Sequence, residues 1–392
     1  MLPQNARHLS HPTPTPPPPH RRMTSLKKTA LHALHSSRKA VMAEFAGYDM
    51  PISYPGMGVL KEHLYTREAA GIFDVSHMGQ YEIRGADRER FLEWVTPVDL
   101  KRTAVTQGAL TMITNAAGGI KDDCIVTKYE DHLFLVLNAG CKDKDMAHLE
   151  AMRAEFKGDV AFVPLERSLI ALQGPQAAAI VGKYVADIPA LDFMYGRQKV
   201  DVKGIPVQLT RCGYTGEDGF EIAVADSQAE ALTELLLAEG AKLIGLGARD
   251  SLRLEAGLNL YGHELTEETT PVAARFMWSI SKRRMEEGGF IGYEPIKHAK
   301  ENASAVPQLR VGILSSGPVA RENTPIELDG KVVGRLTSGC PSPCLKKNVG
   351  LGYVDRALAK KGTAVELVVR GKRVKAEVAT PPFVPAHYYR KP

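Results

Sequence analysis

The change in apolar periodicity along the chain constrains its fold most strongly. Through most of the chain, strand-like segments alternate with helix-like ones, whereas the pattern after residue 308 is almost entirely strand-like. There, Val365, Leu367 and Val369 recur at every second position, and the same spacing returns after the turn at 370–372. Alternate residues of a strand share a face, so this pattern predicts an antiparallel hairpin within a small barrel or sandwich. We therefore expect an α+β protein with a mixed body and a C-terminal antiparallel β-barrel.

A polar stretch between residues 283 and 308 predicts the boundary between these parts, giving a body over 26–300 and a barrel over 308–392. A chain of 392 residues has room for such a division. Residues 1–25 form a separate segment with no acidic residue, three arginines and a proline-rich run. Acid-free leaders that carry arginine are typical of mitochondrial transit peptides. The alternative is a disordered tail without a targeting role.

Composition excludes several classes of protein. The chain is 44% hydrophobic and 24% charged, as in ordinary soluble domains, and no apolar run approaches the roughly 18 residues that cross a bilayer. Of the net charge of +5, three charges belong to Arg7, Arg21 and Arg22, so the body lacks the basic excess of a nucleic-acid-binding protein. The five cysteines, an odd number in a large chain, suit reduced thiols better than a disulfide framework. We expect neither a membrane nor a nucleic acid as partner.

Apolar periodicity in the body predicts three helices and two hairpins, and a fourth helix is predicted below from a glycine-rich turn. A hairpin is expected over 109–114 and 122–129, followed by a strand over 132–138, and a second hairpin over 199–202 and 205–210. The spacing of apolar residues predicts helices over 144–156 and 227–239, and another that begins at Pro175.

Two acidic groups stand out next to glycine-rich turns. Asp122 and Asp123 follow the turn at 115–119, and because adjacent strand residues face opposite sides, only one of them can point into a cavity. Such a carboxylate can stabilise positive charge or accept a proton, although a solvated turn acid gives the same pattern. The run RCGYTGEDGFE at 211–221 poses the same question, with Glu221 at the start of a strand.

The segment Gly245-Leu246-Gly247-Ala248-Arg249-Asp250 resembles a dinucleotide-binding loop only in part, since Asp250 stands where a third glycine would approach a pyrophosphate. A turn into a helix over 248–256 is the better interpretation, with Arg249 and Arg253 one turn apart. Two like charges on one face need acidic partners, either from the protein or from a ligand.

Two further motifs carry weaker signals. Cys340-Pro341-Ser342-Pro343-Cys344 lacks the second pair of ligands that a tetrahedral zinc site needs, so a surface turn is expected and no metal site is predicted. Asp74-Val75-Ser76-His77 contains the residue types of a hydrolase dyad but no nucleophile elbow, which favours hydrogen bonding at the end of a strand.

Eight segments in register resemble the aminomethyltransferase, or T-protein, family of the glycine cleavage system. They are FDVSHMG (73–79), TNAAGGIKDDCIV (114–126), LNAGC (137–141), ALQGP (171–175), TRCGYTGEDGFEI (210–222), ARDSLRLEAGLNLYG (248–262), TSGCPSPCLKKNVGLGYV (337–354) and FVPAHYY (383–389). The resemblance runs from about Leu26 to the C-terminus and leaves residues 1–25 outside it.

The resemblance implies a three-lobed body with two interleaved α+β lobes, a C-terminal barrel and a folate site. It implies transfer of the methylene of an S-aminomethyl-dihydrolipoyl carrier, the H-protein, to tetrahydrofolate, giving 5,10-methylenetetrahydrofolate and ammonia. Tetrahydrofolate would be a co-substrate, with no metal. The P-protein and the L-protein would be functional partners, and the location would be the mitochondrial matrix.

Residue roles follow from the resemblance by position. Asp123 matches the catalytic aspartate of the family, and its carboxylate would stabilise cationic character on the transferred group. Glu221, Arg249 and Tyr388 match folate or substrate contacts, with Glu221 suited to a planar pair of donors. The same cavity is expected to include four more side chains: Asn138, Met78, Tyr261 and Trp278.

Three alternatives share parts of this pattern. A folate-dependent demethylating oxidase would normally carry a flavin domain, and the chain has no dinucleotide fingerprint. A folate-binding factor for iron–sulfur assembly would carry a Lys-Gly-Cys-type motif where this chain has Arg211-Cys212-Gly213-Tyr214. A non-enzymatic subunit of the glycine cleavage assembly would not turn over folate.

Overall fold

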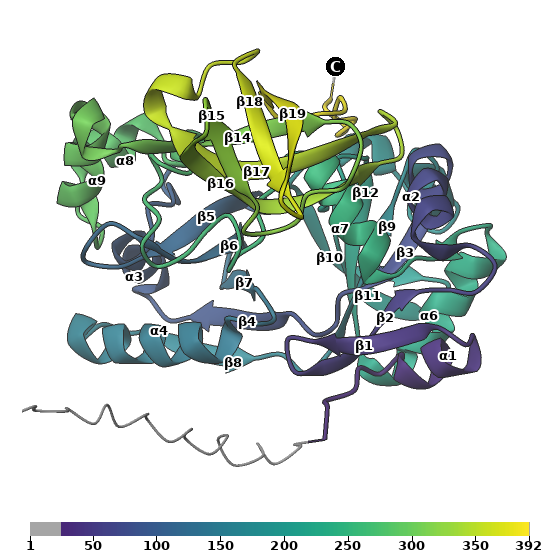
Figure 1. The fold of residues 1–392 in the computed structure, drawn as a ribbon. Helices are drawn as coiled ribbons and strands as arrows, with labels where there is room; N and C mark the ends of the chain where they lie inside the picture. The colour runs from purple at the N-terminus through teal and green to yellow at the C-terminus, as the bar shows by residue number, and fades with distance from the viewer. Residues whose placement is uncertain (1–24, 392) are drawn as a thin grey trace, which may run out of the picture.

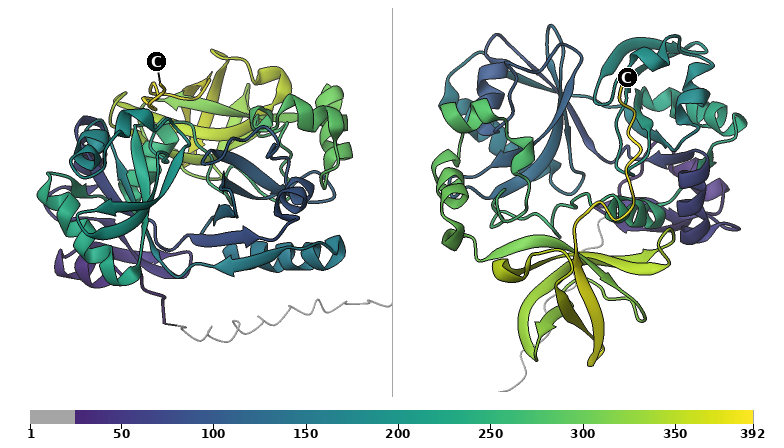
Figure 2. Two further views of the ribbon diagram at one scale, coloured as in Figure 1. Left: turned by 180° about the vertical axis from the view of Figure 1, so that it is seen from behind. Right: turned by 90° about the horizontal axis from the view of Figure 1, so that it is seen from above.

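The computed structural model describes residues 25–391, which form two lobes built on β-sheets and one closed β-barrel (Figure 1). Seen from above, the three lobes lie around a common centre (Figure 2). The predicted leader over 1–25 lies outside the described residues except for Ser25. Within residues 25–391, no helix has the length and apolar character needed to span a membrane.

The first lobe is a five-stranded antiparallel sheet in the order β5-β6-β7-β4-β8, and helices α3 and α4 pack on it. Its elements are β4 (Gly79–Arg84), α3 (Arg88–Val95), β5 (Gly108–Thr114), β6 (Ile120–Lys128), β7 (Leu133–Leu137), α4 (Lys142–Phe156) and β8 (Ala161–Pro164). The predicted hairpin, strand and helix of this region are confirmed to within about two residues at most ends.

The second lobe is a six-stranded sheet in the order β10-β11-β12-β9-β3-β13, in which only the β3–β13 pair is parallel. Its strands are β3 (Gly71–Asp74), β9 (Ser168–Gln173), β10 (Gly196–Val202), β11 (Ile205–Thr210), β12 (Gly219–Val224) and β13 (Lys242–Leu243). Because β3 pairs with β9, the whole first lobe is inserted between two neighbouring strands of the second. The two lobes are therefore interleaved.

Helices and a small ribbon complete this lobe. They are α1 (His32–Ser37), β1 (Val41–Phe45), β2 (Tyr48–Ser53), α2 (Gly58–Glu68), α5 (Ala177–Gly182), η1 (Ile188–Ala190) and α6 (Asp226–Ala238). One continuous core joins α1, α5 and α6 to the sheet, with Leu34, Ile180 and Leu232 as members. Asp74, at the end of β3, accepts hydrogen bonds from Thr29 and the Ser76 backbone and lies 2.9 Å from His35 Nε2. The expectation of strand-end hydrogen bonding is thus confirmed.

The C-terminal lobe is a closed six-stranded barrel, as predicted. Its strands are β14 (Gln308–Ser315), β15 (Pro325–Leu328), β16 (Lys331–Ser342), β17 (Lys347–Asp355), β18 (Ala364–Val369) and β19 (Lys372–Ala379), with a short helix η4 (Arg356–Leu358). The alternating residues Val365, Leu367 and Val369 are all buried in the barrel core.

The polar stretch before the barrel contains helices. These are α8 (Lys282–Glu287), α9 (Tyr293–Glu301) and η3 (Ala303–Ala305), and the short helix η2 (Met277–Ser279) precedes them. Helix α9 buries only Ile296 and Ala299, and most of its other residues are polar. Its apolar face is therefore narrow, and the segment as a whole has a polar composition. This is why composition alone did not predict it.

Helix α7 (Leu246–Glu255) connects the second lobe to the barrel, because it contacts α2 and β2 on one side and the barrel strands β16 and β17 on the other. It confirms the helix predicted over 248–256. Its residue Arg253 is 1% exposed and donates hydrogen bonds to Asp250 (2.8 Å), Glu264 (2.8 Å) and Ser338 of β16 (2.8 Å). The acidic partners that the sequence required for Arg253 are thus supplied by the protein.

Glu255, at the end of α7, makes the complementary connection. Its carboxylate accepts from Arg67 of α2 (3.0 Å) and from Ser342 of β16 (2.5 Å), and it lies 3.0 Å from His63 Nε2. Burial alone would raise the pKa of Glu255, but the hydrogen bonds and charges of His63, Ser342 and Arg67 lower it to about 2. The body and the barrel are joined through a buried, ionised carboxylate.

We predict that Arg253→Met lowers the free energy of unfolding by about 3–5 kcal/mol, because it leaves the buried Glu264 without its cation. Chemical denaturation followed by circular dichroism measures this. Arg373→Met is the control: Arg373 is 55% exposed in its pair with Glu327, so its loss costs less than about 1 kcal/mol. Equal losses in the two variants would contradict the role given to Arg253.

Candidate active site

The turn between β5 and β6 is built to bring an acidic pair to a fixed place. The side-chain oxygen of Asn115 accepts from Ala117 and Gly119 backbone N–H groups (3.0 and 2.9 Å), and its amide donates to the Glu267 carbonyl (2.8 Å). A Cβ on Gly119 would lie 1.8 Å from that carbonyl oxygen, so only glycine allows this approach. The start of β6 is therefore anchored on the loop that follows α7.

Asp122 and Asp123 point to opposite faces of β6, as strand geometry requires. Asp122 is 0% exposed and faces the side of α4, whereas Asp123 is half-buried on the other face. The Asn138 side-chain amide donates to Asp122 Oδ1 (2.9 Å), Asp123 Oδ1 (3.1 Å) and the Asp123 carbonyl (3.0 Å). Burial, reinforced by the charge of Asp122, raises the pKa of Asp123 to about 8.

The second lobe contributes Glu221 of β12 and Arg249 of α7, both half-buried. Burial raises the pKa of Glu221, and the Arg249 charge and the Cys212 thiol oppose that rise. Burial in turn lowers the pKa of Arg249, and Glu221 opposes it. The buried Nη1 of Arg249 has no hydrogen-bond partner among the described residues. A group that is charged, buried and unsatisfied is available to a ligand.

Tyr214 connects these two contributions, and the sequence analysis did not single it out as a site residue. The Arg249 guanidinium lies over its ring at 4.7 Å, and its hydroxyl donates to the Asn259 carbonyl. Burial is the main reason that the pKa of Tyr214 is raised, and the charges of Arg253, Asp123 and Arg249 all act on the hydroxyl. Asp123 of the first lobe and Arg249 of the second thus both affect the Tyr214 hydroxyl. An aromatic residue between glycines gave no signal of this in the sequence.

The remaining predicted side chains lie in different surroundings. Tyr261 donates to the Ile120 carbonyl (3.1 Å) at the start of β6, and Met78 is half-buried after β3, against the core between the two sheets. Trp278 is 70% exposed and packs edge to face on Phe276. That Trp278 lines the same cavity as the other side chains stays a prediction, and its side chain is largely exposed in this structure.

Tyr388 belongs to the C-terminal tail, which leaves the barrel and runs back to the second lobe (Figure 2). Its ring stacks on Phe193 with 4.5 Å between centroids. Its neighbour His387 lies 3.0 Å from Glu217, and Tyr389 packs on Arg211 at 3.7 Å. These contacts fix the tail, and with it Tyr388, against the second lobe.

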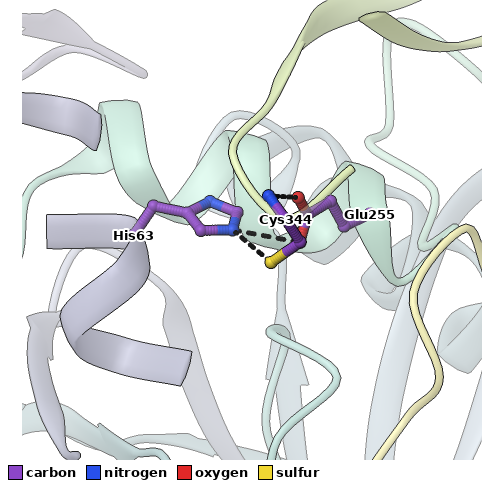
Figure 3. Close-up of side chains that lie close together, drawn as sticks. All are labelled: His63, Glu255 and Cys344. Carbon is purple, nitrogen blue, oxygen red and sulfur yellow. Dashed lines mark hydrogen bonds and ion pairs between the residues drawn. The ribbon is translucent and has the colours of Figure 1, made fainter. Parts of the chain in front are cut away.

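Two groups of described residues have a composition that could hold a metal. In the first, His63 Nε2 lies between Glu255 and the Cys344 sulfur, which points toward the His63 ring at 3.7 Å (Figure 3). Glu255 is already occupied by Arg67 and Ser342, and burial together with Glu255 raises the pKa of the Cys344 thiol to about 11. This group therefore acts as a structural junction between α2, α7 and the barrel.

The second group is Asp122, Cys141 and Asp145, all buried between β6 and α4. No sequence pattern indicated that Asp145 and Cys141 belong to the surroundings of the site. Asp145 has the spacing of an ordinary first-turn acid of a helix, and only the packing of α4 on β6 brings it behind Asp123.

Comparisons with known proteins agree with this architecture. The family model described as GCVT N-terminal domain matches residues 31–284, and the one described as glycine cleavage T-protein C-terminal barrel domain matches residues 309–385. The mitochondrial aminomethyltransferase of Dictyostelium discoideum is 46% identical over 381 residues, covering 93% of this chain and 94% of that relative. The mitochondrial aminomethyltransferase of Solanum tuberosum is 46% identical over 375 residues, covering 93% of this chain and 91% of that relative.

The crystal structure of the glycine cleavage system aminomethyltransferase T from Bartonella henselae superimposes with a TM-score of 0.88 at 38% identity. The match covers 93% of this chain and all of that one. Two family models cover most of the described residues, and relatives well above 30% identity span nearly the whole chain. The chain therefore belongs to the glycine cleavage T-protein family.

Proposed function

We propose that this protein is a mitochondrial aminomethyltransferase of the glycine cleavage system, and that it uses tetrahydrofolate as the acceptor. Two relatives that are 46% identical to this chain, and that match it over nearly their whole length, are named mitochondrial aminomethyltransferases. They favour an enzyme over the alternative of a folate-binding factor for iron–sulfur assembly. The full reaction would take the methylene of S-aminomethyl-dihydrolipoyl H-protein to tetrahydrofolate and release ammonia.

The observation that carries the folate proposal is the set of half-buried charged groups around Tyr214. Arg249 has a buried guanidinium nitrogen without a partner, and burial raises the pKa of both Glu221 and Asp123. These residues fit a reduced folate, whose amino-amide edge offers a planar pair of donors and whose tail is anionic. Glu221 can accept that pair, and Arg249 can hold an anionic part or balance Glu221.

Asp123 is proposed as the catalytic residue. Tetrahydrofolate supplies two nitrogen atoms, N5 and N10, that bind the one-carbon unit. As the carbon–sulfur bond of the carrier breaks, positive charge develops on the aminomethyl group, and a nearby Asp123 carboxylate stabilises it. The same carboxylate is placed to accept a proton. Asn138 orients Asp123 through its amide, and Met78, Tyr261 and Tyr388 are proposed to line the site, with Trp278 at its rim.

The cellular setting follows from the same proposal. The lipoylated H-protein would be the direct partner, with the P-protein and the L-protein acting before and after it on the same carrier. The mitochondrial matrix is the proposed compartment. The five cysteines are all free among the described residues, which suits a reducing location.

We predict that Asp123→Asn lowers kcat by about 10²–10⁴-fold while the Kd for tetrahydrofolate stays nearly unchanged, because the amide keeps the shape but loses the charge. A coupled assay with lipoylated H-protein measures kcat, and calorimetry measures folate binding. Glu130→Gln, an exposed acid just beyond β6, is the control and should keep full activity. Unchanged turnover in Asp123→Asn would refute the assignment.

We predict that kcat/KM rises with increasing pH through the pKa of Asp123, about 8, because the ionised carboxylate is the active form. The rate is thus lost as the pH falls below that value and Asp123 takes up a proton. Rates measured from pH 6 to pH 10 test this. Asp123→Asn should remove the rise, and a profile that keeps the same midpoint in the variant would assign the titration to another group.

A further inference from the structure

A pair of buried carboxyl groups lies directly behind the candidate catalytic residue. Asp122 of β6 and Asp145 in the first turn of α4 are both 0% exposed. One carboxyl oxygen of Asp122, one of Asp145 and the sulfur of the buried Cys141 all lie within 4.8 Å of one another. The function proposed above uses neither acid.

The hydrogen bonds to the two acids are unequal. Asp122 accepts from the side chain of Asn138 (2.9 Å) and from its backbone N–H (3.3 Å). Both oxygens of Asp145 are buried and have no hydrogen-bond partner among the described residues. The Lys144 ammonium is 4.0 Å away and instead donates to the Lys121 carbonyl, to Tyr261 and to Glu267.

Two buried carboxyl groups at this distance cannot both carry a charge without a large cost, and an ionised buried carboxylate without donors is costly by itself. One shared proton removes both costs, because a protonated carboxyl group donates to its ionised neighbour. The two N–H bonds stabilise the charged form of Asp122, whereas no hydrogen bond stabilises the charged form of Asp145 in the described structure. The charges of Lys144 and Lys121 lower the pKa of Asp145, but burial and the charge of Asp122 raise it by more. The proton therefore belongs on Asp145.

We propose that Asp145 is a neutral carboxylic acid at physiological pH, that it donates its proton to the Asp122 carboxylate, and that the single charge of this pair holds the Asn138 amide against Asp123. This rests on the proposed function for the role of Asp123, but the state of Asp145 does not. Burial raises the pKa of both acids, which agrees with a retained proton.

The charges around the pair leave this proton in place. From β6, Lys121 is paired with Glu267 (3.3 Å). From α4, Lys144 also binds Glu267, and burial is the main cause of the lowered pKa of His148. The link before α4 brings Cys141, whose thiol has a pKa raised by burial, and the loop after α7 brings Tyr261. None of these groups donates a hydrogen bond to Asp145 in the described structure.

The pair affects Asp123 in two ways. The side-chain amide of Asn138 donates hydrogen bonds to both Asp122 and Asp123. An Asp122 carboxylate held in one place therefore also holds this amide in position for its hydrogen bond to Asp123 Oδ1 (3.1 Å). The charge on Asp122 also contributes, after burial, to the raised pKa of Asp123. Asp145 acts through both residues and is therefore a positioning residue.

The state of Asp145 can be measured without any assay of activity. In an Asp123→Asn background, infrared spectroscopy near pH 7 should show the C=O band of a protonated carboxylic acid. Adding Asp145→Asn should abolish that band, whereas adding Asp143→Asn, an exposed acid on the same turn of α4, should keep it. Asp145→Asn should also release one proton fewer on unfolding at this pH. A band that persists in Asp145→Asn, or is absent from the start, overturns the proposal.

The effect on Asp123 is tested by the pH profile of kcat/KM. Asp145→Asn should keep the wild-type midpoint, because it replaces one neutral donor by another. Asp122→Asn with Asp145→Asn should move the midpoint to lower pH, because it removes the charge behind Asp123. If Asp145→Asn alone moves the midpoint as far, Asp145 is ionised and the proposal is wrong. Elemental analysis gives a further test. A stoichiometric metal ion that is lost in Asp145→Asn would show that a metal cation, rather than a proton, balances the two acids, and would overturn the proposal.

The two proposals fail separately. An Asp123→Asn variant that keeps its turnover would remove the catalytic role of Asp123 and leave the infrared result untouched. Circular dichroism of each variant confirms that it is folded, and the exchange of a carboxyl group for an amide of the same shape makes this the expected result.

Discussion

The buried charges of α7 are the interaction on which the rest of the structure depends. Arg253 and Glu255 stand on one helix, yet one reaches Ser338 of the barrel and the other reaches both α2 and Ser342 of the barrel. A buried charge is tolerated only when its partners are in place, so these interactions require one mutual arrangement of the second lobe and the barrel. Because Arg249 lies on the same helix, that requirement also fixes one side of the candidate site.

The opposite side of the site depends on a single strand. β6 places Asp122 on the face that packs on α4 and Asp123 on the opposite face, and Asn138 of the adjacent strand end binds both. The properties of Asp123 on one face of β6 therefore depend on the proton proposed for Asp145 on the other face. Sites of this kind tune a carboxylate through burial and a neighbouring charge rather than through contacts with bulk solvent.

Local patterns predicted much of the fold. The hairpin of β5 and β6, the helix α4 and the alternating strands β18 and β19 follow from apolar periodicity and glycine-rich turns, which act over a few residues. Helices α8 and α9 were missed, since α9 buries only Ile296 and Ala299 and its sequence is otherwise polar. Of the candidate site, Asp123, Glu221 and Arg249 were named from motifs, whereas Tyr214 and Asp145 were not, because their roles depend on neighbours distant in sequence.

The sequence by itself determined several of the strands and helices, the β-rich C-terminal part and the family, because these depend on short-range periodicity and on motifs in register. It also determined that Asp122 and Asp123 must face opposite ways, which is a property of any strand. Only the tertiary structure decided which of the two is buried and what lies behind it. The packing of α4 on β6 places Asp145 against Asp122, and burial there turns an ordinary helix acid into a group that retains its proton.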